Sequence, residues 1–405
     1  MRILFLNPVG SLGGAERSLI EVLSILSEDR PEWVIGLITG RDGPLVNEAK
    51  SLGVKVEILS MPTGIEKIGD SGFSGQAGLW RLLLMAILLP YKVCILLIYL
   101  RRFAKKIQEI NPDVIHSNGF KFHVILGLTR GVRSKTIWHA RDFIKSRKLV
   151  GQLLRAVCRK PNLLVANSHA VENDWKSLMP DLKSIVLYNT VAIPHKKSRE
   201  IPCEHFYRPI SDIPVKVGLV GSFARWKGHK LFLEAVRILT EEFSENKAQF
   251  FIVGGPLYAT TGSQWTRIEL ERMASSLGIT DRVVFVPHQT DVNSVYECLD
   301  IIVHASTKPE PFGRTIIEGM SYRKPVVAAM AGGVVEIIED GKDALAFQPG
   351  DSKDLADKIG EVLRDQKLRI RIGEEGYQKV SKLFSRESIR LKLVKMYEGL
   401  MEEHS

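Results

Sequence analysis

Cysteine is scarce in this chain, and its placement argues against several kinds of site. The four cysteines, Cys94, Cys158, Cys203 and Cys298, are scattered and include no CxxC pair. This argues against a metal site and against a disulfide framework, and is typical of reduced thiols in a cytosolic protein. The opening segment, MRILFLNPVG, contains too short an apolar run for a signal peptide. It predicts a buried first strand instead.

A good membrane-spanning helix is also lacking. Residues 79–106 are very apolar, but Pro90 and Lys92 divide them into two runs, Leu82–Leu89 and Val93–Leu100. A spanning helix needs about 20 mostly apolar residues. The segment ends in the basic residues Arg101, Arg102, Lys105 and Lys106. We therefore predict two short helices lying on an anionic membrane surface, with the basic residues near lipid phosphates, and a pair of core helices is the alternative.

Acidic residues are under-represented in the first half only. Residues 1–200 contain 29 Lys and Arg against 17 Asp and Glu, and the remainder contains 27 against 29. Nucleic acid, an anionic membrane, an anionic substrate or a merely solvated basic surface would each explain this excess. Nucleic acid is the least favoured partner, because the basic residues are not interleaved with an aromatic platform.

Short β-branched runs alternate with helical patterns along both halves. This alternation predicts an α/β fold, in which two doubly wound parallel-sheet, Rossmann-like domains face each other across a cleft. Residues 190–216 are rich in proline and charge, so we place a linker at 196–215, between domains at 1–195 and 216–385. The predicted strands are RILFLNPV, WVIGLIT, KVEILS, DVIHSN, KTIWHA, LLVANS and SIVLYN in the first half, and VKVGLVGS, QFFIVGG, RVVFVP, DIIVHAS, PVVAAM and ALAFQP in the second.

The common glycine-rich nucleotide motifs are absent, but related turns occur. The segment GSLGGAE (10–16) follows the first strand and is neither GxGxxG nor GxxxxGK[ST]. Its glycines would let the backbone approach a ligand at a helix start, although many such turns need glycine only for tightness. In GSFARWKGH (221–229), Arg225 and Lys227 would suit a diphosphate, and a solvated basic loop is the alternative.

The segment KPEPFGRTIIEGM (308–320) places two carboxylates around a glycine turn. A helix is predicted to begin near Gly313 or Arg314, so that backbone amides there face the cleft and can bind an anion. Glu310 in the loop could accept hydrogen bonds from sugar hydroxyls, and Glu318 in the helix could accept those of a ribose. An exposed Glu310 and an ordinary helix-face Glu318 are the alternative, which the following glycine-rich AGGVVEII argues against.

Together, GGAER, VGSFARWKGH, PEPFGRTIIEGM and AGGVVEII resemble the nucleotide-sugar glycosyltransferases of the GT-B fold, and most closely the retaining family 4 (glycosyl transferases group 1). The resemblance runs essentially end to end and is most specific in residues 217–350. It implies that a C-terminal helix at about 386–405 packs back on the first domain. This sequence departs from the family in having Ser222 after Gly221, and Arg225 would supply the missing charge.

The resemblance also implies roles for individual residues. His139, Arg225, Lys227 and Glu310 would be catalytic, with His139 near the reacting sugar. Residues from several loops would bind the donor: Gly13, Gly14, Arg225, Lys227, Pro287, His288, Glu310, Phe312, Gly313, Arg314, Thr315 and Glu318. The nucleobase would lie along residues 286–289.

These features predict a hexosyl-type transferase that uses a nucleoside-diphosphate sugar as substrate and needs no cofactor or metal, since no Asp-x-Asp pair lies in a suitable loop. The resemblance implies retention, and the acceptor would be a lipid-linked or other saccharide in bacterial surface polysaccharide synthesis. The protein would be cytoplasmic, on the inner face of the cell membrane. A nucleotide-sugar 2-epimerase and a non-catalytic sugar-nucleotide or membrane-binding protein are the alternatives.

Overall fold

The computed structural model describes residues 1–62, 79–156, 158–194, 215–242, 248–256, 262–289 and 291–402, with the backbone alone for 79–89. These residues form two compact units, Met1–Tyr188 with Ile389–Ser405, and Asn189–Ser388. The predicted linker at 196–215 lies almost wholly outside the described residues.

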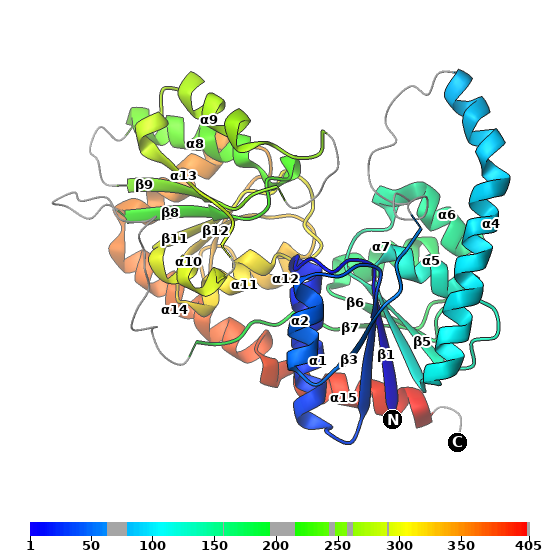
Figure 1. The fold of residues 1–405 in the computed structure, drawn as a ribbon. Coiled ribbons are helices and arrows are strands. Elements are labelled where there is room, and N and C mark those ends of the chain that lie inside the picture. Colours follow the sequence, from blue (N-terminus) through cyan, green and yellow to red (C-terminus); the bar gives the residue numbers. More distant parts are fainter. Residues whose placement is uncertain are drawn as a thin grey trace. The chain divides into compact units, whose positions relative to one another are not determined.

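The first unit is built on a seven-stranded sheet whose paired strands are all parallel, in the order β3-β2-β1-β4-β5-β6-β7 (Figure 1). Its strands are β1 (Arg2–Asn7), β2 (Val34–Thr39), β3 (Lys55–Ile58), β4 (Val114–Asn118), β5 (Lys135–Ala140), β6 (Leu163–Ala166) and β7 (Ser184–Val186). Its helices are α1 (Gly14–Asp29), α2 (Pro44–Ser51), α4 (Leu79–Ile110), α5 (Phe120–Leu128), η1 (Lys145–Arg147), α6 (Lys148–Ala156), α7 (His169–Leu178) and most of α15 (Arg386–Glu402).

Side chains of β1 alternate between two cores, one on each face of this sheet. Ile3 and Phe5 pack with residues of α1, α2 and α15, whereas Leu4 and Leu6 pack with residues of α4, α5, α6 and α7. Strands covered on both faces read as continuous apolar runs, as β1 does. The end of the chain is part of the first core, because Leu393 and Tyr397 of α15 are fully buried there.

The prediction of two short helices at 79–106 is wrong, because a single helix, α4, continues through Pro90. A proline removes one backbone hydrogen bond and can bend a helix without ending it. In Figure 1 the first half of α4 extends away from the sheet. In its second half, Tyr99, Phe103 and Ile107 are buried against the first unit. On the other side, Tyr91, Val93, Cys94, Leu97, Ile98, Arg101, Arg102 and Lys105 are exposed.

The second unit contains a six-stranded sheet with the order β10-β9-β8-β11-β12-β13, again parallel throughout. Its strands are β8 (Val215–Val220), β9 (Ala248–Val253), β10 (Val283–Val286), β11 (Ile301–His304), β12 (Val326–Ala329) and β13 (Leu345–Phe347). The helices are η3 (Arg225–Lys227), α8 (His229–Glu242), α9 (Arg267–Ser276), η4 (Thr280–Arg282), α10 (Val292–Cys298), α11 (Arg314–Ser321), α12 (Val334–Ile337), α13 (Ser352–Arg364) and α14 (Gln366–Leu383).

The predicted fold class is confirmed, since each predicted strand occurs and the two sheets are parallel. In each sheet the strand order reverses beside the first strand, between β1 and β4 and between β8 and β11. Ligands of open α/β sheets bind beyond the carboxyl ends of the strands at such a point. Among the described residues, no helix is both long and apolar enough to cross a bilayer.

One prediction about cysteine is wrong. Cys94 and Cys158 are free thiols, but Cys298 is disulfide-bonded. Cysteines far apart in sequence become neighbours only through the fold, so their scattered spacing could not reveal this bond.

Candidate functional site

Lys227 and Glu310 are brought together at the reversal point of the second sheet. Lys227 lies in η3 after β8, and Glu310 lies in the loop after the neighbouring strand β11. The Lys227 Nζ donates to both carboxylate oxygens of Glu310, at 3.0 and 2.8 Å. The sequence named both residues, and the fold makes them an ion pair where an α/β sheet binds its ligand.

Two further side chains, one hydroxyl and one imidazole, contact the Glu310 carboxylate. The Ser306 hydroxyl donates to it at 3.0 Å, and His304 Nε2 lies 3.3 Å away. Burial raises the pKa of this carboxyl, but the Lys227 charge and the His304 hydrogen bond outweigh burial and hold the pKa well below its usual value. Glu310 is therefore a buried, ionised acceptor with fixed orientation.

Glycines explain how the two loops approach so closely. Gly228 follows Lys227 with φ +79°, and a Cβ there would lie 1.8 Å from the Ala305 carbonyl oxygen. On the other side, Gly332 has φ +68°, and a Cβ there would lie 2.3 Å from the Glu310 carbonyl oxygen. The glycine-rich segments predicted near the site thus pack backbone against backbone around the Glu310 loop. Any larger residue at Gly228 or Gly332 would push that loop away.

Arg225 does not join Lys227 in its ion pair. Its guanidinium lies over the Trp265 ring, 3.6 Å from the centroid, and contacts Glu269 at 3.5 Å. The Arg225 side chain is 42% exposed. The two cations of the GSFARWKGH segment therefore contact different carboxylates, Lys227 that of Glu310 and Arg225 that of Glu269.

Helix α11 begins at Arg314, as predicted, with Gly313 as its N-cap at φ +110°. The first amides of a helix have no acceptor within it, so those of Arg314 and Thr315 are donors suited to an anion. Glu318 contacts the Arg314 guanidinium at 2.9 Å and accepts from the Tyr296 hydroxyl at 2.7 Å. The carboxylate proposed for a ribose is thus held in place by two neighbours.

Three of the remaining predicted donor residues, Phe312, Pro287 and His288, also belong to the second unit. Phe312 is buried and packs edge-to-face on Phe384. Pro287 and His288 are exposed directly after β10. Within the described residues, no group of three or more His, Cys, Asp or Glu side chains could hold a metal ion; metal independence stays a prediction.

In the first unit, Gly13 and Gly14 form the start of α1, and the residue that sequence reasoning missed is Glu16. The buried Glu16 Oε2 accepts from the Gly13 amide at 3.1 Å, and its Oε1 accepts from the Asn7 side chain at 3.4 Å. Burial raises the pKa of the Glu16 carboxyl, although these hydrogen bonds oppose the shift. A glutamate three residues after the N-cap is the acidic half of a capping box, a signal that could have identified it even though the Gly13 N-cap has no side chain.

A polar network continues from Asn7 along the carboxyl ends of the strands. The Asn118 side chain donates to Asn7 at 2.7 Å, and Arg141 donates to Asn118. His139, at the end of β5, lies next to Arg141 and is 2% exposed. Asn118 and Arg141 were also missed, and their signal is their position as the last residue of a strand and the first after one.

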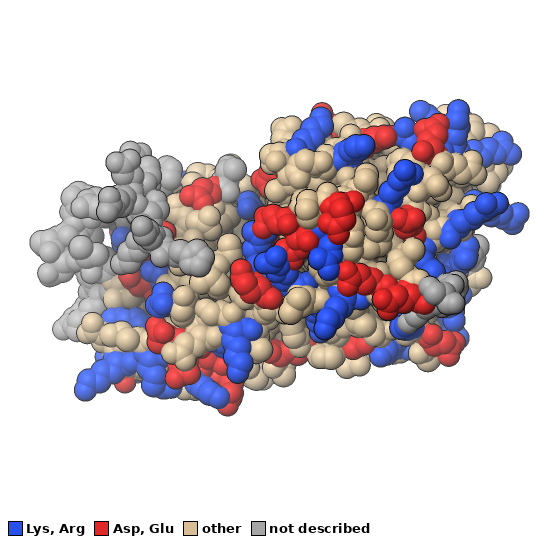
Figure 2. All heavy atoms as spheres, turned by 90° about the horizontal axis from the view of Figure 1, so that it is seen from below, with Lys and Arg blue, Asp and Glu red and all other residues tan. Residues whose placement is uncertain are grey.

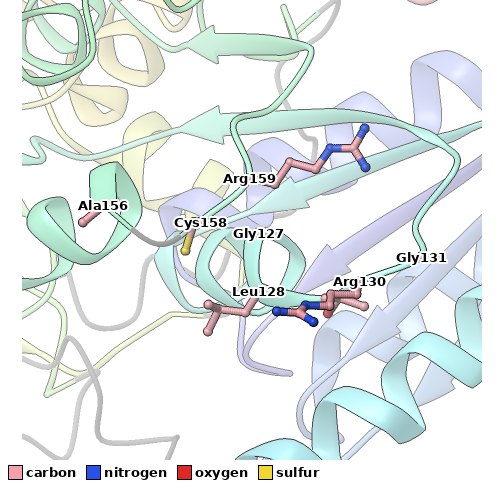
Figure 3. Close-up of a pocket in the computed structure, with 8 residues that line it drawn as sticks. Gly127, Leu128, Arg130, Gly131, Ala156, Cys158 and Arg159 are labelled. Carbon is pink, nitrogen blue, oxygen red and sulfur yellow. The ribbon is translucent and has the colours of Figure 1, made fainter.

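A separate surface hollow lies elsewhere on the first unit (Figure 3). It has a volume of about 540 Å³ and is lined by Gly127–Gly131, Ala156, Cys158 and Arg159. These residues precede β5 and β6, so the hollow lies at the amino ends of the strands. None of the predicted site residues lines it.

Comparison with known proteins assigns the family. Residues 205–379 match the family model described as Glycosyl transferases group 1, and residues 45–193 match that of Glycosyltransferase Family 4. The chain belongs to the GT-B glycosyltransferases. This chain is 31% identical to a D-inositol 3-phosphate glycosyltransferase of Corynebacterium urealyticum over 187 residues. The aligned residues make up 45% of this chain and 43% of that protein. The match thus spans less than half of that relative.

Longer matches occur at lower identity. A lipopolysaccharide core biosynthesis mannosyltransferase, LpcC of Rhizobium leguminosarum bv. viciae, is 25% identical over 75% of the glycosyltransferase and 90% of LpcC. The crystal structure of Anabaena HepE in complex with UDP-glucose is similar over 98% of this chain and 100% of HepE, with a TM-score of 0.74 and 23% identity. At that identity the likeness establishes the shared fold.

Proposed function

We propose that this glycosyltransferase moves a sugar from a nucleoside-diphosphate sugar to a lipid-linked or other saccharide acceptor, with retention of anomeric configuration. The observation behind this proposal is the largely buried Lys227–Glu310 pair, with side chains 21% and 11% exposed, at the reversal point of the second sheet. It combines a fixed carboxylate acceptor, suited to sugar hydroxyls, with a cation suited to phosphate. The UDP-glucose complex of the similarly folded HepE supports a donor of this class.

Each group would serve one part of the donor. Glu310 accepts hydrogen bonds from sugar hydroxyls, and Glu318 accepts those of the ribose. A diphosphate competes with Glu310 for Lys227 and also meets the first amides of α11. The exposed residues Pro287 and His288 would contact the base through their backbone.

Breaking the donor bond leaves negative charge on the departing diphosphate. Lys227, Arg225 and the α11 amides supply positive charge in place of a metal ion. We propose front-face attack, in which the departing phosphate oxygen takes the proton of the acceptor hydroxyl as the new glycosidic bond forms. No carboxylate then acts as a nucleophile on the sugar.

The acceptor proposal draws on LpcC, whose described role is in lipopolysaccharide core biosynthesis, and on α4. The exposed side of α4 combines Tyr91, Leu97 and Ile98 with Arg101 and Arg102. Apolar side chains followed by cations are typical of helices that lie on anionic bilayers. We therefore propose that α4 holds the protein on the inner face of the cell membrane, where it acts in surface glycolipid or polysaccharide synthesis.

A donor panel tests the reaction. Purified protein is incubated with each nucleotide sugar, with and without membrane lipid extract and with and without EDTA, and nucleoside diphosphate release is measured. We expect one donor to be used, with release that needs the lipid extract and persists in EDTA. Losing one hydrogen bond to a charged group costs about 1.5–3 kcal/mol, so Glu310→Gln should lower kcat/KM by about ten- to a hundredfold.

The control is Glu339→Gln, which changes a carboxylate that is 61% exposed and should leave kcat/KM unchanged. Product anomers, identified by NMR, report retention or inversion. If no donor releases diphosphate and none raises the melting temperature, the transferase proposal fails. A donor that changes only at C2 of its sugar would identify a 2-epimerase, and stabilisation without turnover would indicate a binding protein.

A further inference from the structure

Three buried aromatic side chains form a hydrogen-bonded chain inside the first unit. The Tyr397 hydroxyl lies 2.6 Å from His116 Nδ1, and His116 Nε2 lies 3.0 Å from His139 Nδ1. The exposed fractions of these residues are 0%, 1% and 2%. Tyr397 belongs to α15 and follows His116 by 281 positions, so the end of the chain reaches the ends of β4 and β5 through this contact.

The charges of these groups limit where their protons can lie. Burial, with the Arg141 charge, lowers the pKa of His116 and His139 well below the ordinary value. Burial raises the pKa of Tyr397 well above its ordinary value, although Arg141 opposes the shift. Both imidazoles are therefore neutral with a single N–H each, and the tyrosine keeps its proton.

Arg141 selects between the two possible proton arrangements. Its Nη2 lies 3.4 Å from His139 Nδ1, and a guanidinium can only donate. His139 Nδ1 must then be an acceptor, which places the His139 proton on Nε2. His116 completes the chain by donating from Nε2 to His139 and accepting at Nδ1 from the Tyr397 hydroxyl.

The outer nitrogen of His139 is the open end of this chain. His139 Nε2 is buried and has no hydrogen-bond partner among the described residues, and His139 lies at the carboxyl end of β5, two strands from the first strand of the sheet. A buried N–H without an acceptor is costly unless a ligand supplies one. A substrate oxygen bound at this edge of the sheet would do so.

We propose that Tyr397 and Arg141 are positioning residues that fix His139 in its Nε2–H form, so that His139 donates a hydrogen bond to a substrate oxygen and does not act as a base. This proposal rests on the proposed transferase function for the identity of the substrate. The arrangement of protons within the free protein does not depend on it. Tyr397 thus acts on the site through His116, without touching the substrate.

The proton positions are measured directly on the full-length protein. Nitrogen-15 labelling of histidine and long-range proton–nitrogen NMR distinguish a protonated ring nitrogen from a bare one, and the single variants His116→Gln and His139→Gln assign the signals. We expect both imidazoles to be neutral at pH 7 with the proton on Nε2. A wild-type His139 with its proton on Nδ1, or a charged His139, would overturn the proposal.

The variant Tyr397→Phe removes one hydroxyl and retains the ring that packs against Phe5 and Trp33. We expect His116 to become a tautomer mixture that donates to His139 only part of the time, while Arg141 keeps the His139 proton on Nε2. We expect kcat/KM to fall about three- to tenfold, the usual effect of one lost neutral hydrogen bond. Tyr99→Phe is the control, because Tyr99 is also buried in this unit and its hydroxyl donates to the Leu59 carbonyl at 3.4 Å, away from the histidines. Tyr99→Phe should leave both readouts unchanged.

The two proposals fail in different ways. An Nε2–H His139 in a wild-type protein that uses no donor would sustain the tautomer assignment and reject the transferase function. An active wild-type enzyme whose Tyr397→Phe variant keeps both its His116 tautomer and its kcat/KM would reject the positioning role alone.

Discussion

The Lys227–Glu310 pair can be tested by removing one charge or both. Breaking a buried pair by removing one partner costs about 3–5 kcal/mol, because the remaining charge is left uncompensated. The cost of Lys227→Met should lie near the lower end of this range, since the Lys227 side chain is 21% exposed. In the double variant Lys227→Met/Glu310→Gln neither charge of the pair remains, so part of the lost stability should be recovered. Equilibrium urea unfolding measures both, and a double variant less stable than Lys227→Met would contradict the ion-pair account.

The same pair predicts how stability depends on pH. The pKa of Glu310 is lowered in the folded protein, whereas an unfolded glutamate titrates near about 4.3. The carboxylate therefore contributes its full stabilisation above that unfolded pKa, and the contribution is lost as pH falls towards the folded pKa. Below about pH 4.3, wild type should lose stability more steeply than Glu310→Gln. Parallel stability profiles for wild type and Glu310→Gln would show that the ionised Glu310 contributes nothing to stability.

Single residues of the site were partly predictable. Lys227 and Glu310 could be named because each lies in a distinctive glycine-flanked segment after a strand-like run, whereas His139 was named only from the family resemblance. Their partners could not be named, because Tyr397 lies 281 positions from His116 and no sequence pattern joins the two. The stacking of Arg225 on Trp265 was likewise hidden, since it depends on how two separate loops fold.

At the scale of elements, the turn before α12 is predicted to hold Glu310 in place. Gly332→Ala would bring a Cβ within 2.3 Å of the Glu310 carbonyl oxygen at a left-handed φ. We expect a loss of stability beyond the ~1–2 kcal/mol of left-handed strain alone, together with a higher KM for the donor as Glu310 is displaced. Thermal unfolding and steady-state kinetics measure the two effects.

Gly341→Ala is the matched control for this turn. Gly341 also has a left-handed φ, +75°, but nothing lies within 4 Å of a Cβ there. Gly341→Ala should lose only the stability expected from left-handed strain, and its KM for the donor should be unchanged. If the two alanine variants behaved alike, close packing against Glu310 would not be the reason for the glycine.

The elements themselves were the most predictable level. All strands of both sheets could be read from short β-branched runs because strands buried on both faces are continuously apolar. The exception was α4, where Pro90 was taken as a break. A proline favours a helix end locally, but the path of the chain on both sides of it is decided by packing that the local pattern does not contain.

For the molecule as a whole, composition predicted the charge imbalance but not its arrangement. On the face shown in Figure 2, Lys and Arg side chains are interspersed with Asp and Glu, so the basic excess of residues 1–200 does not form one patch there. The disulfide of Cys298 was also beyond the sequence. Both depend on which distant segments meet, which composition does not record.

The exposed side of α4 predicts binding of the whole protein to anionic vesicles. Leu97 and Ile98 are about half exposed, at 51% and 50%, and burying one such side chain is worth about 1.5–3 kcal/mol. In vesicle flotation, Leu97→Glu/Ile98→Glu should therefore weaken binding at least about tenfold.

The control Ile370→Glu/Leu391→Glu adds the same charge at residues 65% and 70% exposed elsewhere and should bind nearly as wild type. Because Arg101 and Arg102 would contribute electrostatically, wild-type binding should weaken with salt and on uncharged vesicles. Equal loss in both double variants would trace binding to net charge and remove the role of α4.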